Sequence, residues 1–286
     1  MSEQVNRIQL KPCPTVKTID KVNFAQAYFK PLKPLVIKNL ASDWPAQSKW
    51  TPDFFRAHHG EKRVTVYDKN FVTPGKGYMN GVKQMRLSEY IDHILHSETD
   101  LRLFLYNITT HIPELLSDIV LPDIVDGFSK RFVFMFFGCK GSVTQMHFDI
   151  DMSHVFHTTL YGKKTVTLYP YQQGRNLHRT PFTCRTYVDV HAPDFNRFPR
   201  LENAHGYRVT LEAGDTLFIP SGYWHHMVYD EAGYALSLRC SNPDLKSKLH
   251  GVYNVTIMQS IDRMMNALCP DKWHTWKEKK ALDNGR

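Results

Sequence analysis

Two stretches of the chain decide its fold, Val143-Thr-Gln-Met-His-Phe-Asp149 and Gly214-Asp-Thr-Leu-Phe-Ile-Pro-Ser-Gly-Tyr-Trp-His225. They supply two imidazoles, those of His147 and His225, and the carboxylate of Asp149. In a β-strand, residues i and i+2 project from the same face, so His147 and Asp149 can bind one ion while Phe148 packs behind them. Two histidines and one carboxylate form the facial triad that holds non-haem Fe(II) and leaves coordination positions open. The sequence therefore predicts an open metal site.

Both stretches lie at the ends of short β-like runs. Glycine and proline turns separate the later runs, at residues 212–215 and 220–223. Short strands at near-regular spacing with such turns indicate an antiparallel sandwich or barrel. We therefore expect a mainly β fold with flanking helices, whose strands cover residues 131–137, 143–149, 207–211, 215–219, 224–229 and 234–239.

These residues resemble the JmjC and cupin-like oxygenases, which are Fe(II)- and 2-oxoglutarate-dependent hydroxylases with a double-stranded β-helix (jelly-roll) core. The matching motifs stand in the family's order, and the resemblance covers about residues 20 to 243. It implies Fe(II) as the metal and 2-oxoglutarate as the cosubstrate. The motifs are residues 33–45, 143–149, 161–170, 192–199 and 214–225.

The resemblance also implies roles for single residues. His147, Asp149 and His225 would be the metal ligands and the catalytic centre. Lys164, the second lysine after a glycine, would bind the distal carboxylate of 2-oxoglutarate, together with the Thr144 hydroxyl. The lysine is expected to point into the barrel, because apolar residues at positions 166 and 168 share its strand face.

Strand alternation also predicts on which face of the sheet three other histidines lie. Strand alternation puts His226 on the face opposite His225, so we expect His226 to be structural. His154 and His157 also point to opposite faces, so at most one of them looks into the barrel.

The chain departs from the asparaginyl-hydroxylase branch of the family in the cosubstrate pocket. Phe104 stands where a tyrosine assists 2-oxoglutarate, Tyr106 where a glutamine sits, and Arg239 where an asparagine lies near the metal. The segment between Asp149 and Gly162 is two residues longer. Tyr106 and Arg239 remain candidate cosubstrate-binding residues, whereas the identity of the substrate does not transfer with the resemblance.

The chain divides into three expected parts. Residues 1–130 form a mixed α/β segment that packs on the core, 131–243 form the β-helix core, and 244–286 form a C-terminal helical segment. In the first part, Asp20, Thr51 and Ser88 predict helix starts. The expected elements are helices at 21–30, 52–59, 89–95 and 112–119, and strands at 35–38 and 101–106.

Apolar residues recur at helical spacing after residue 244 and predict a helix over residues 244–268. Such a stripe usually packs on a core, but this one is wide for a helix with one domain face to cover. In similar family members the C-terminal helices dimerise, so we expect a homodimer. The stripe consists of Leu245, Leu249, Val252, Tyr253, Ile257, Ile261, Met264, Met265 and Leu268.

Composition indicates a cytoplasmic protein. No apolar run approaches the length of a membrane span, and the N-terminus has no signal-like apolar segment. The five cysteines are scattered, which predicts reduced thiols. The net charge of +8 would attract an acidic partner, but the densest basic patch, residues 277–280, is expected to solvate a helix end.

The leading hypothesis is a 2-oxoglutarate-dependent dioxygenase that hydroxylates a protein or peptide side chain. One alternative is a hydroxylase of a modified RNA base, which the basic charge favours mildly. The other is a non-catalytic metal-binding cupin module, against which the complete triad and Lys164 argue.

Overall fold

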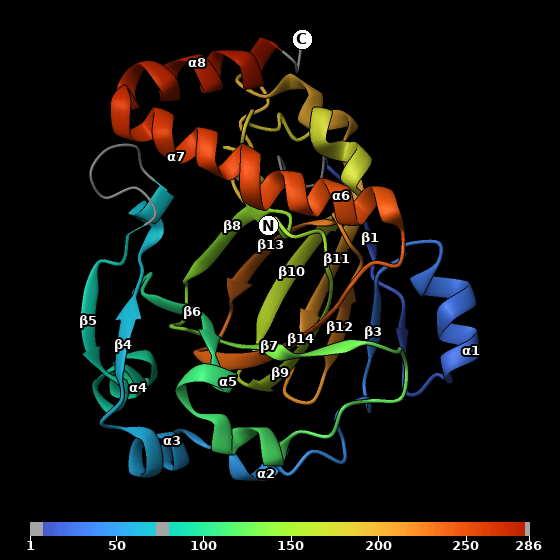
Figure 1. The fold of residues 1–286 in the computed structure, drawn as a ribbon, viewed down its shortest axis with the longest axis vertical. Coiled ribbons are helices and arrows are strands. Elements are labelled where there is room, and N and C mark those ends of the chain that lie inside the picture. Colours follow the sequence, from blue (N-terminus) through green and yellow to red (C-terminus); the bar gives the residue numbers. More distant parts are fainter. Residues whose placement is uncertain (1–7, 73–79, 284–286) are drawn as a thin grey trace.

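The computed structural model of the protein describes residues 8–72 and 80–283. Its centre is a double-stranded β-helix in which strands of two facing sheets enclose an interior (Figure 1). One sheet contains β8 (Val143–His147), β10 (Lys164–Tyr169), β11 (His205–Leu211) and β13 (Trp224–Tyr229). The other contains β7 (Phe128–Gly138), β9 (His154–Tyr161), β12 (Thr216–Ile219) and β14 (Gly233–Cys240). The predicted jelly-roll core is confirmed, although the strand expected over 143–149 ends at His147.

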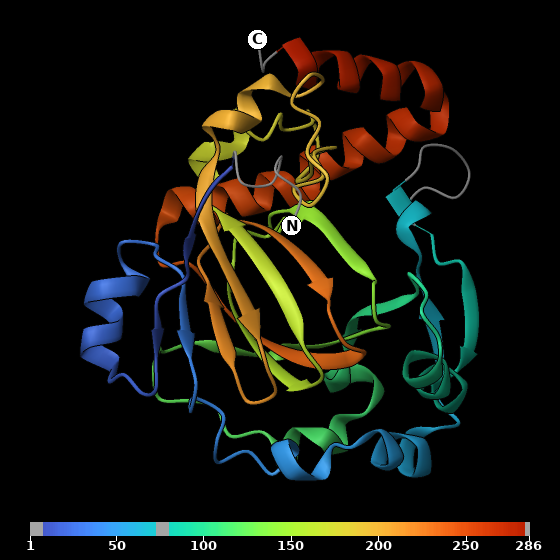
Figure 2. The same cartoon turned by 180° about the vertical axis from the view of Figure 1, so that it is seen from behind.

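Strands from the N-terminal part extend both sheets. β1 (Gln9–Pro12) pairs with β11 in parallel, while β2 (Thr15–Val16) and β3 (Leu35–Ile37) continue the second sheet beyond β12. At the other edge β6 (Arg102–Asn107) pairs with β7. A separate hairpin-like pair, β4 (Arg63–Val66) and β5 (Lys83–Arg86), stands beside the barrel, as Figure 2 shows from behind.

The helices before the barrel follow their predicted caps in part. The Asp20 carboxylate accepts from the backbone amides of the first turn, and the Thr51 hydroxyl accepts from Phe54 N at 3.1 Å. The helix expected at 89–95 begins two residues earlier, at Leu87, and the helix predicted at 112–119 is a 3-10 helix over Pro113–Asp118. The segments are α1 (Lys21–Phe24) with a π-helical turn (Ala25–Phe29), α2 (Ala46–Lys49), α3 (Pro52–His59), 3-10 turns at Lys69–Val72 and Pro113–Asp118, α4 (Leu87–His96) and α5 (Ile108–His111).

Three apolar clusters hold these layers together. The inner cluster lies between the two sheets and includes Val166, Leu168 and Met227. The outer cluster joins the outer face of the seven-stranded sheet to the N-terminal helices. The third cluster lies on the five-stranded sheet and packs the connection between β10 and β11 against it. This connection carries 3-10 turns at Tyr171–Arg175 and Pro199–Asn203.

The C-terminal helices lie across one end of the barrel, and the last one turns back along its neighbour (Figures 1 and 2). A nearly continuous helix runs through α6 (Leu245–Tyr253), a π-helical turn (Asn254–Met258) and α7 (Gln259–Leu268), and α8 (Pro270–Asp283) follows. The predicted helix over 244–268 is therefore confirmed, and its inward face carries Gly251, Asn254, Met258, Asp262 and Asn266.

The apolar stripe of this helix points away from the barrel. Leu245, Leu249, Val252, Tyr253, Ile257, Met264 and Leu268 are 44% to 73% exposed. The expectation for residues 277–280 is wrong at Lys277, which is buried and donates to Asp262 Oδ1 at 2.6 Å. The five cysteines are free thiols. Among residues 8–72 and 80–283, no helix is long and apolar enough to cross a membrane.

Candidate metal centre

The end of β8 and the start of β13 bring the predicted triad together. His225 lies directly opposite His147 in the β13–β8 ladder, and the two ring centroids are 4.2 Å apart. Asp149 follows two residues after His147, just beyond the end of the strand. One ligand atom from each of His147, Asp149 and His225 lies within 4.8 Å of the others. This separation suits three ligands that share one face of a metal ion.

Backbone carbonyls fix which nitrogen of each histidine is available. His147 Nδ1 lies 2.8 Å from Gln145 O, and His225 Nδ1 lies 3.1 Å from Tyr223 O. A carbonyl oxygen only accepts, so both Nδ1 atoms carry the proton and both Nε2 lone pairs are left for a metal. Burial and the neighbouring His225 lower the pKa of His147 to about 3, and burial lowers the pKa of His225. Both imidazoles are therefore neutral at physiological pH, as ligands must be.

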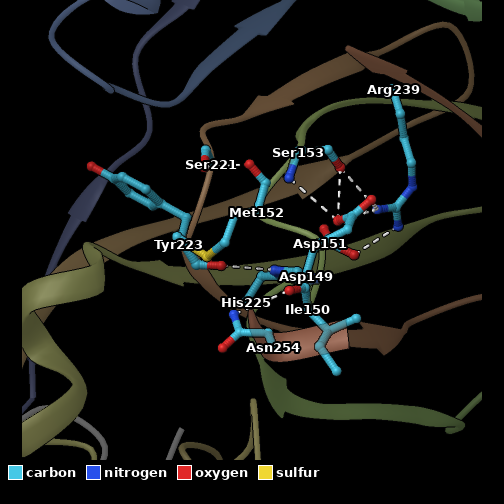
Figure 3. A network of polar contacts seen from close by, with 10 residues as sticks. All are labelled: Asp149, Ile150, Asp151, Met152, Ser153, Ser221, Tyr223, His225, Arg239 and Asn254. Carbon is cyan, nitrogen blue, oxygen red and sulfur yellow. Dashed lines mark hydrogen bonds and ion pairs between the residues drawn. The ribbon is translucent and has the colours of Figure 1, made fainter. Parts of the chain in front are cut away.

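Arg239 holds the carboxylate of Asp149, the third candidate ligand (Figure 3). Its Nη2 donates to Asp149 Oδ1 at 2.7 Å, and its Nη1 reaches Asp151 at 3.1 Å and Ser153 Oγ at 3.0 Å. Burial alone would raise the pKa of Asp149, but the Arg239 charge lowers it below its ordinary value. The carboxylate is thus ionised, with one oxygen engaged by the guanidinium and the other left for a metal.

The loop that carries Asp149 is clamped from two sides. Phe148 is fully buried against Trp224, with ring centroids 4.9 Å apart, so it packs behind the site as predicted. On the other side Asn254 of the C-terminal helix donates to Ile150 O at 3.1 Å (Figure 3). The helix approaches so closely that a Cβ on Gly251 would lie 2.3 Å from the carbonyl oxygen of Asp151. The C-terminal helix therefore helps to position Asp149, a candidate metal ligand.

Lys164 is a fully buried cation inside the same barrel. Its Nζ lies 3.3 Å from His157 Nε2 and 4.3 Å from the centroid of the Tyr229 ring. His157 Nδ1 in turn lies 2.8 Å from Ser237 Oγ. No carboxylate of the described residues forms an ion pair with Lys164, and burial lowers its pKa to about 7. Lys164 is thus a buried cation without an anionic partner among the described residues.

The remaining predicted residues fall on both sides of the sheets. Thr144 lies opposite Met227, an inner-cluster residue, and so shares its face. Tyr106 instead belongs to the outer cluster, where its ring stacks on His111 at 4.6 Å. A bulge between Leu103 and Tyr106 shifts the alternation of β6. The structure therefore does not bring Tyr106 to the triad.

The other histidines lie where strand alternation put them. His226 is buried on the outer face, with its ring 4.8 Å from that of His191. His157 points into the barrel, whereas His154 packs against Phe29 and Phe218 outside it. Sequence reasoning missed the contact of His157 with Lys164. It also missed Ser237, although Ser237 and Arg239 are two residues apart on β14 and so share a face.

A jelly-roll barrel that holds two histidines, one carboxylate and a buried lysine defines a class, the JmjC-type oxygenases. The cupin-like domain family matches residues 21–250, and the chain belongs to this family. Its cofactors, Fe(II) and 2-oxoglutarate, fit the donor set, because the free Nε2 atoms and carboxylate oxygen suit Fe(II) and the anion-free Lys164 suits a dicarboxylate.

The chain is similar to curated proteins that carry different names, two demethylases and a tRNA-modifying protein. Lysine-specific demethylase 8 of Xenopus tropicalis is 26% identical over 236 residues, which cover 79% of this chain and 51% of that protein. The tRNA wybutosine-synthesizing protein 5 of Gallus gallus is 25% identical over 244 residues, covering 79% and 76%. Lysine-specific demethylase JMJ30 of Arabidopsis thaliana is 27% identical over 241 residues, covering 77% and 54%. The chain spans about half the length of the two demethylases.

Proposed function

We propose that the protein is a 2-oxoglutarate-dependent dioxygenase that hydroxylates a protein or peptide side chain. Fe(II) would be held by His147, Asp149 and His225, and together with 2-oxoglutarate it supplies the oxidising chemistry when bound. The observation that carries the proposal is the pairing, within one barrel, of an open three-ligand site and the buried cation of Lys164.

In this proposal Lys164 binds the distal carboxylate of 2-oxoglutarate, and Thr144 adds a hydroxyl donor from the same inner face. A charge-assisted hydrogen bond contributes roughly 1.5–3 kcal/mol, about twice a neutral one. His157 supports this role, because its Nε2 accepts from Lys164 only in the Nδ1–H tautomer, which Ser237 Oγ stabilises. The ammonium is thereby oriented and remains able to donate to a ligand.

Arg239 is proposed to act on the metal ligand rather than on the cosubstrate. Its guanidinium keeps Asp149 ionised and fixes its rotamer, while Asp151 and Ser153 occupy the other guanidinium nitrogen. Partners of metal ligands commonly change metal affinity 10- to 100-fold. Arg239 would therefore set the affinity of the Asp149 carboxylate for iron.

A protein substrate and an RNA substrate are the two candidates. The names of the relatives point both ways, to lysine-specific demethylases and to a tRNA-modifying protein. We favour a protein because Lys277 of the basic run at 277–280 is buried and ion-paired, which leaves only Lys279 and Lys280 of this run exposed. A non-catalytic cupin module is disfavoured, because the triad and Lys164 are all present.

Treated cell extracts separate these candidates. Succinate formation from 2-oxoglutarate is measured with extract that has been digested by protease or by ribonuclease. Activation that protease abolishes supports a protein substrate, whereas activation that only ribonuclease abolishes would refute it in favour of RNA. Formaldehyde release would distinguish demethylation from stable hydroxylation, in which the product keeps the added oxygen atom.

A homodimer and a cytoplasmic location complete the proposal. The exposed stripe on α6 and α7 offers a continuous apolar surface of the kind that marks an interface. The same helix holds the Asp149 loop through Gly251 and Asn254, so dimerisation would also stiffen the metal site. Five free cysteines fit a reducing compartment such as the cytoplasm.

A further inference from the structure

The inner face of β7 carries a row of phenylalanine side chains. Phe132, Phe134 and Phe136 stand two residues apart on this strand and so share one face. That face is the inner one, because Phe134 pairs with Ser237, whose hydroxyl contacts the inward-pointing His157. The residues that alternate with the three belong to the outer cluster, whereas the three themselves belong to none of the apolar clusters of the described residues. Their rings therefore line the barrel interior without being covered by a core.

The row passes from the proposed cosubstrate pocket to the metal centre. At its inner end, the Phe136 ring centroid lies 5.6 Å from that of His157, which contacts the buried lysine. In the middle, the Arg239 guanidinium lies 5.4 Å from the centroid of the Phe134 ring. The same guanidinium donates to Asp149 at 2.7 Å. One side chain thus connects the middle of the row to a candidate metal ligand.

The other end of the row is open to solvent. Phe132 is 44% exposed, and its ring stacks on Phe134 with 6.1 Å between centroids and 12° between planes. A single exposed apolar side chain is ordinary on a protein surface. This one, however, continues a row that reaches the contact partner of Asp149, so its exposed ring lies where a molecule could approach the triad.

Charge restricts what can stack on these rings. The Arg131 guanidinium lies 5.4 Å from the Phe132 ring centroid, and the Arg239 guanidinium lies at the same distance from Phe134. Each ring already faces one cation, so a further cation such as a lysine side chain would meet two guanidinium charges of its own sign. A phenyl ring also offers no hydrogen bond to replace the hydration of a polar group. A neutral apolar side chain suits the surface best.

We infer that Phe132 and Phe134 form a subsite for a large, neutral apolar side chain of the peptide substrate, next to the residue that is hydroxylated. This inference rests on the proposed function. With 2-oxoglutarate at the Phe136 end of the row, the Phe132 end is left for the substrate. Burial of apolar surface on Phe132 would then supply substrate affinity, and the two guanidinium groups would select against a cationic side chain.

A random peptide library tests the inference without a known substrate. The full-length protein is loaded with Mn(II) and the unreactive amide-linked analogue of 2-oxoglutarate, and retained peptides are identified by mass spectrometry. Large apolar residues should be enriched and lysine depleted at one position. In a retained peptide, replacement of that apolar residue by alanine should raise the dissociation constant about tenfold, because most of the buried apolar surface is lost.

A double-mutant cycle connects this preference to Phe132. Phe132→Ala should also weaken binding of the retained peptide about tenfold, and combining it with the alanine-replaced peptide should add little further loss. Phe132→Tyr, which keeps the ring, should preserve the preference. Val22→Ala is the matched control, because Val22 is a 63% exposed apolar residue on α1, outside the barrel, and its loss should change nothing.

The possible failures are distinguishable. Retained peptides without an apolar preference, or losses from Phe132→Ala and from the altered peptide that simply multiply, would refute the subsite and leave the peptide hydroxylase standing. Weaker binding of the 2-oxoglutarate analogue by Phe132→Ala would assign Phe132 to the packing of the site and also refute the subsite. Retention of purified RNA but of no peptide would refute the proposed function and this inference together.

Discussion

Substitution of Lys164 by alanine removes the only buried cation of the barrel interior that the described residues leave without an anion. Burial lowers its pKa from 10.5 to about 7, which corresponds to a penalty of about 5 kcal/mol on the charged form. A bound carboxylate offsets this penalty, so loss of the lysine leaves the carboxylate unpaired. Removing one partner of a buried ion pair costs about 3–5 kcal/mol. We expect 2-oxoglutarate affinity to fall at least a hundredfold.

The same lysine gives the binding a pH dependence. His157 stays neutral, because burial first and the Lys164 charge second hold its pKa well below 6.5, and burial raises the pKa of Tyr229. Among the groups that face the carboxylate, only Lys164 then titrates near neutrality. A bound anion raises the lysine pKa above its value in the free protein. Affinity is therefore fully present below about pH 7 and falls about tenfold for each pH unit above it.

The assay is a calorimetric titration of the Mn(II)-loaded protein with the unreactive amide-linked analogue of 2-oxoglutarate, between pH 6 and 9. Lys163→Ala is the matched control, because the neighbouring Lys163 is partly exposed and pairs with Glu212 at 3.3 Å. Its affinity should equal that of the wild type. An unchanged dissociation constant in Lys164→Ala, or a constant affinity from pH 6 to 9, would refute this reasoning.

Three further experiments test the metal ligands, Arg239 and the proposed dimer. His225→Ala should lose stoichiometric iron and His226→Ala should keep it, because only His225 faces the triad; metal analysis that gave the reverse would contradict this register. Arg239→Met should weaken metal binding about 10- to 100-fold in a competitive titration, and wild-type affinity in this variant would show that the guanidinium contributes nothing. Ile257→Asp should convert the dimer to a monomer in light scattering, whereas Leu121→Asp, on an exposed loop, should not. A wild-type monomer at high micromolar concentration would contradict the homodimer and show that the stripe is not its interface.

Sequence periodicity was sufficient to assign side chains to the inner or outer face wherever the strands are regular. Alternation placed His225 and His226 on opposite faces and Lys164 inside the barrel, and the structure agrees on both points. The motif order also predicted the jelly-roll core. These features depend on residues i and i+2, which a sequence shows directly.

The sequence did not predict irregular backbone or contacts between distant segments. The bulge in β6 turns Tyr106 into the outer cluster, and a bulge leaves no mark in an alternating pattern. The contacts of Arg239 with Asp149 and Asp151 join segments about 90 residues apart, which no local spacing encodes. The burial of Lys277 depends in the same way on Asp262, which lies on a different helix.

The most direct test of the central claim is succinate formation from 2-oxoglutarate by the purified protein. We predict that succinate appears only with Fe(II), disappears on chelation and returns when Fe(II) is restored. His226→Ala should retain the activity, while His225→Ala and Lys164→Ala should lose it. No succinate from the folded, Fe(II)-loaded protein in the presence of cell extract, or equal succinate from the wild type and His225→Ala, would contradict the assignment as an iron- and 2-oxoglutarate-dependent oxygenase.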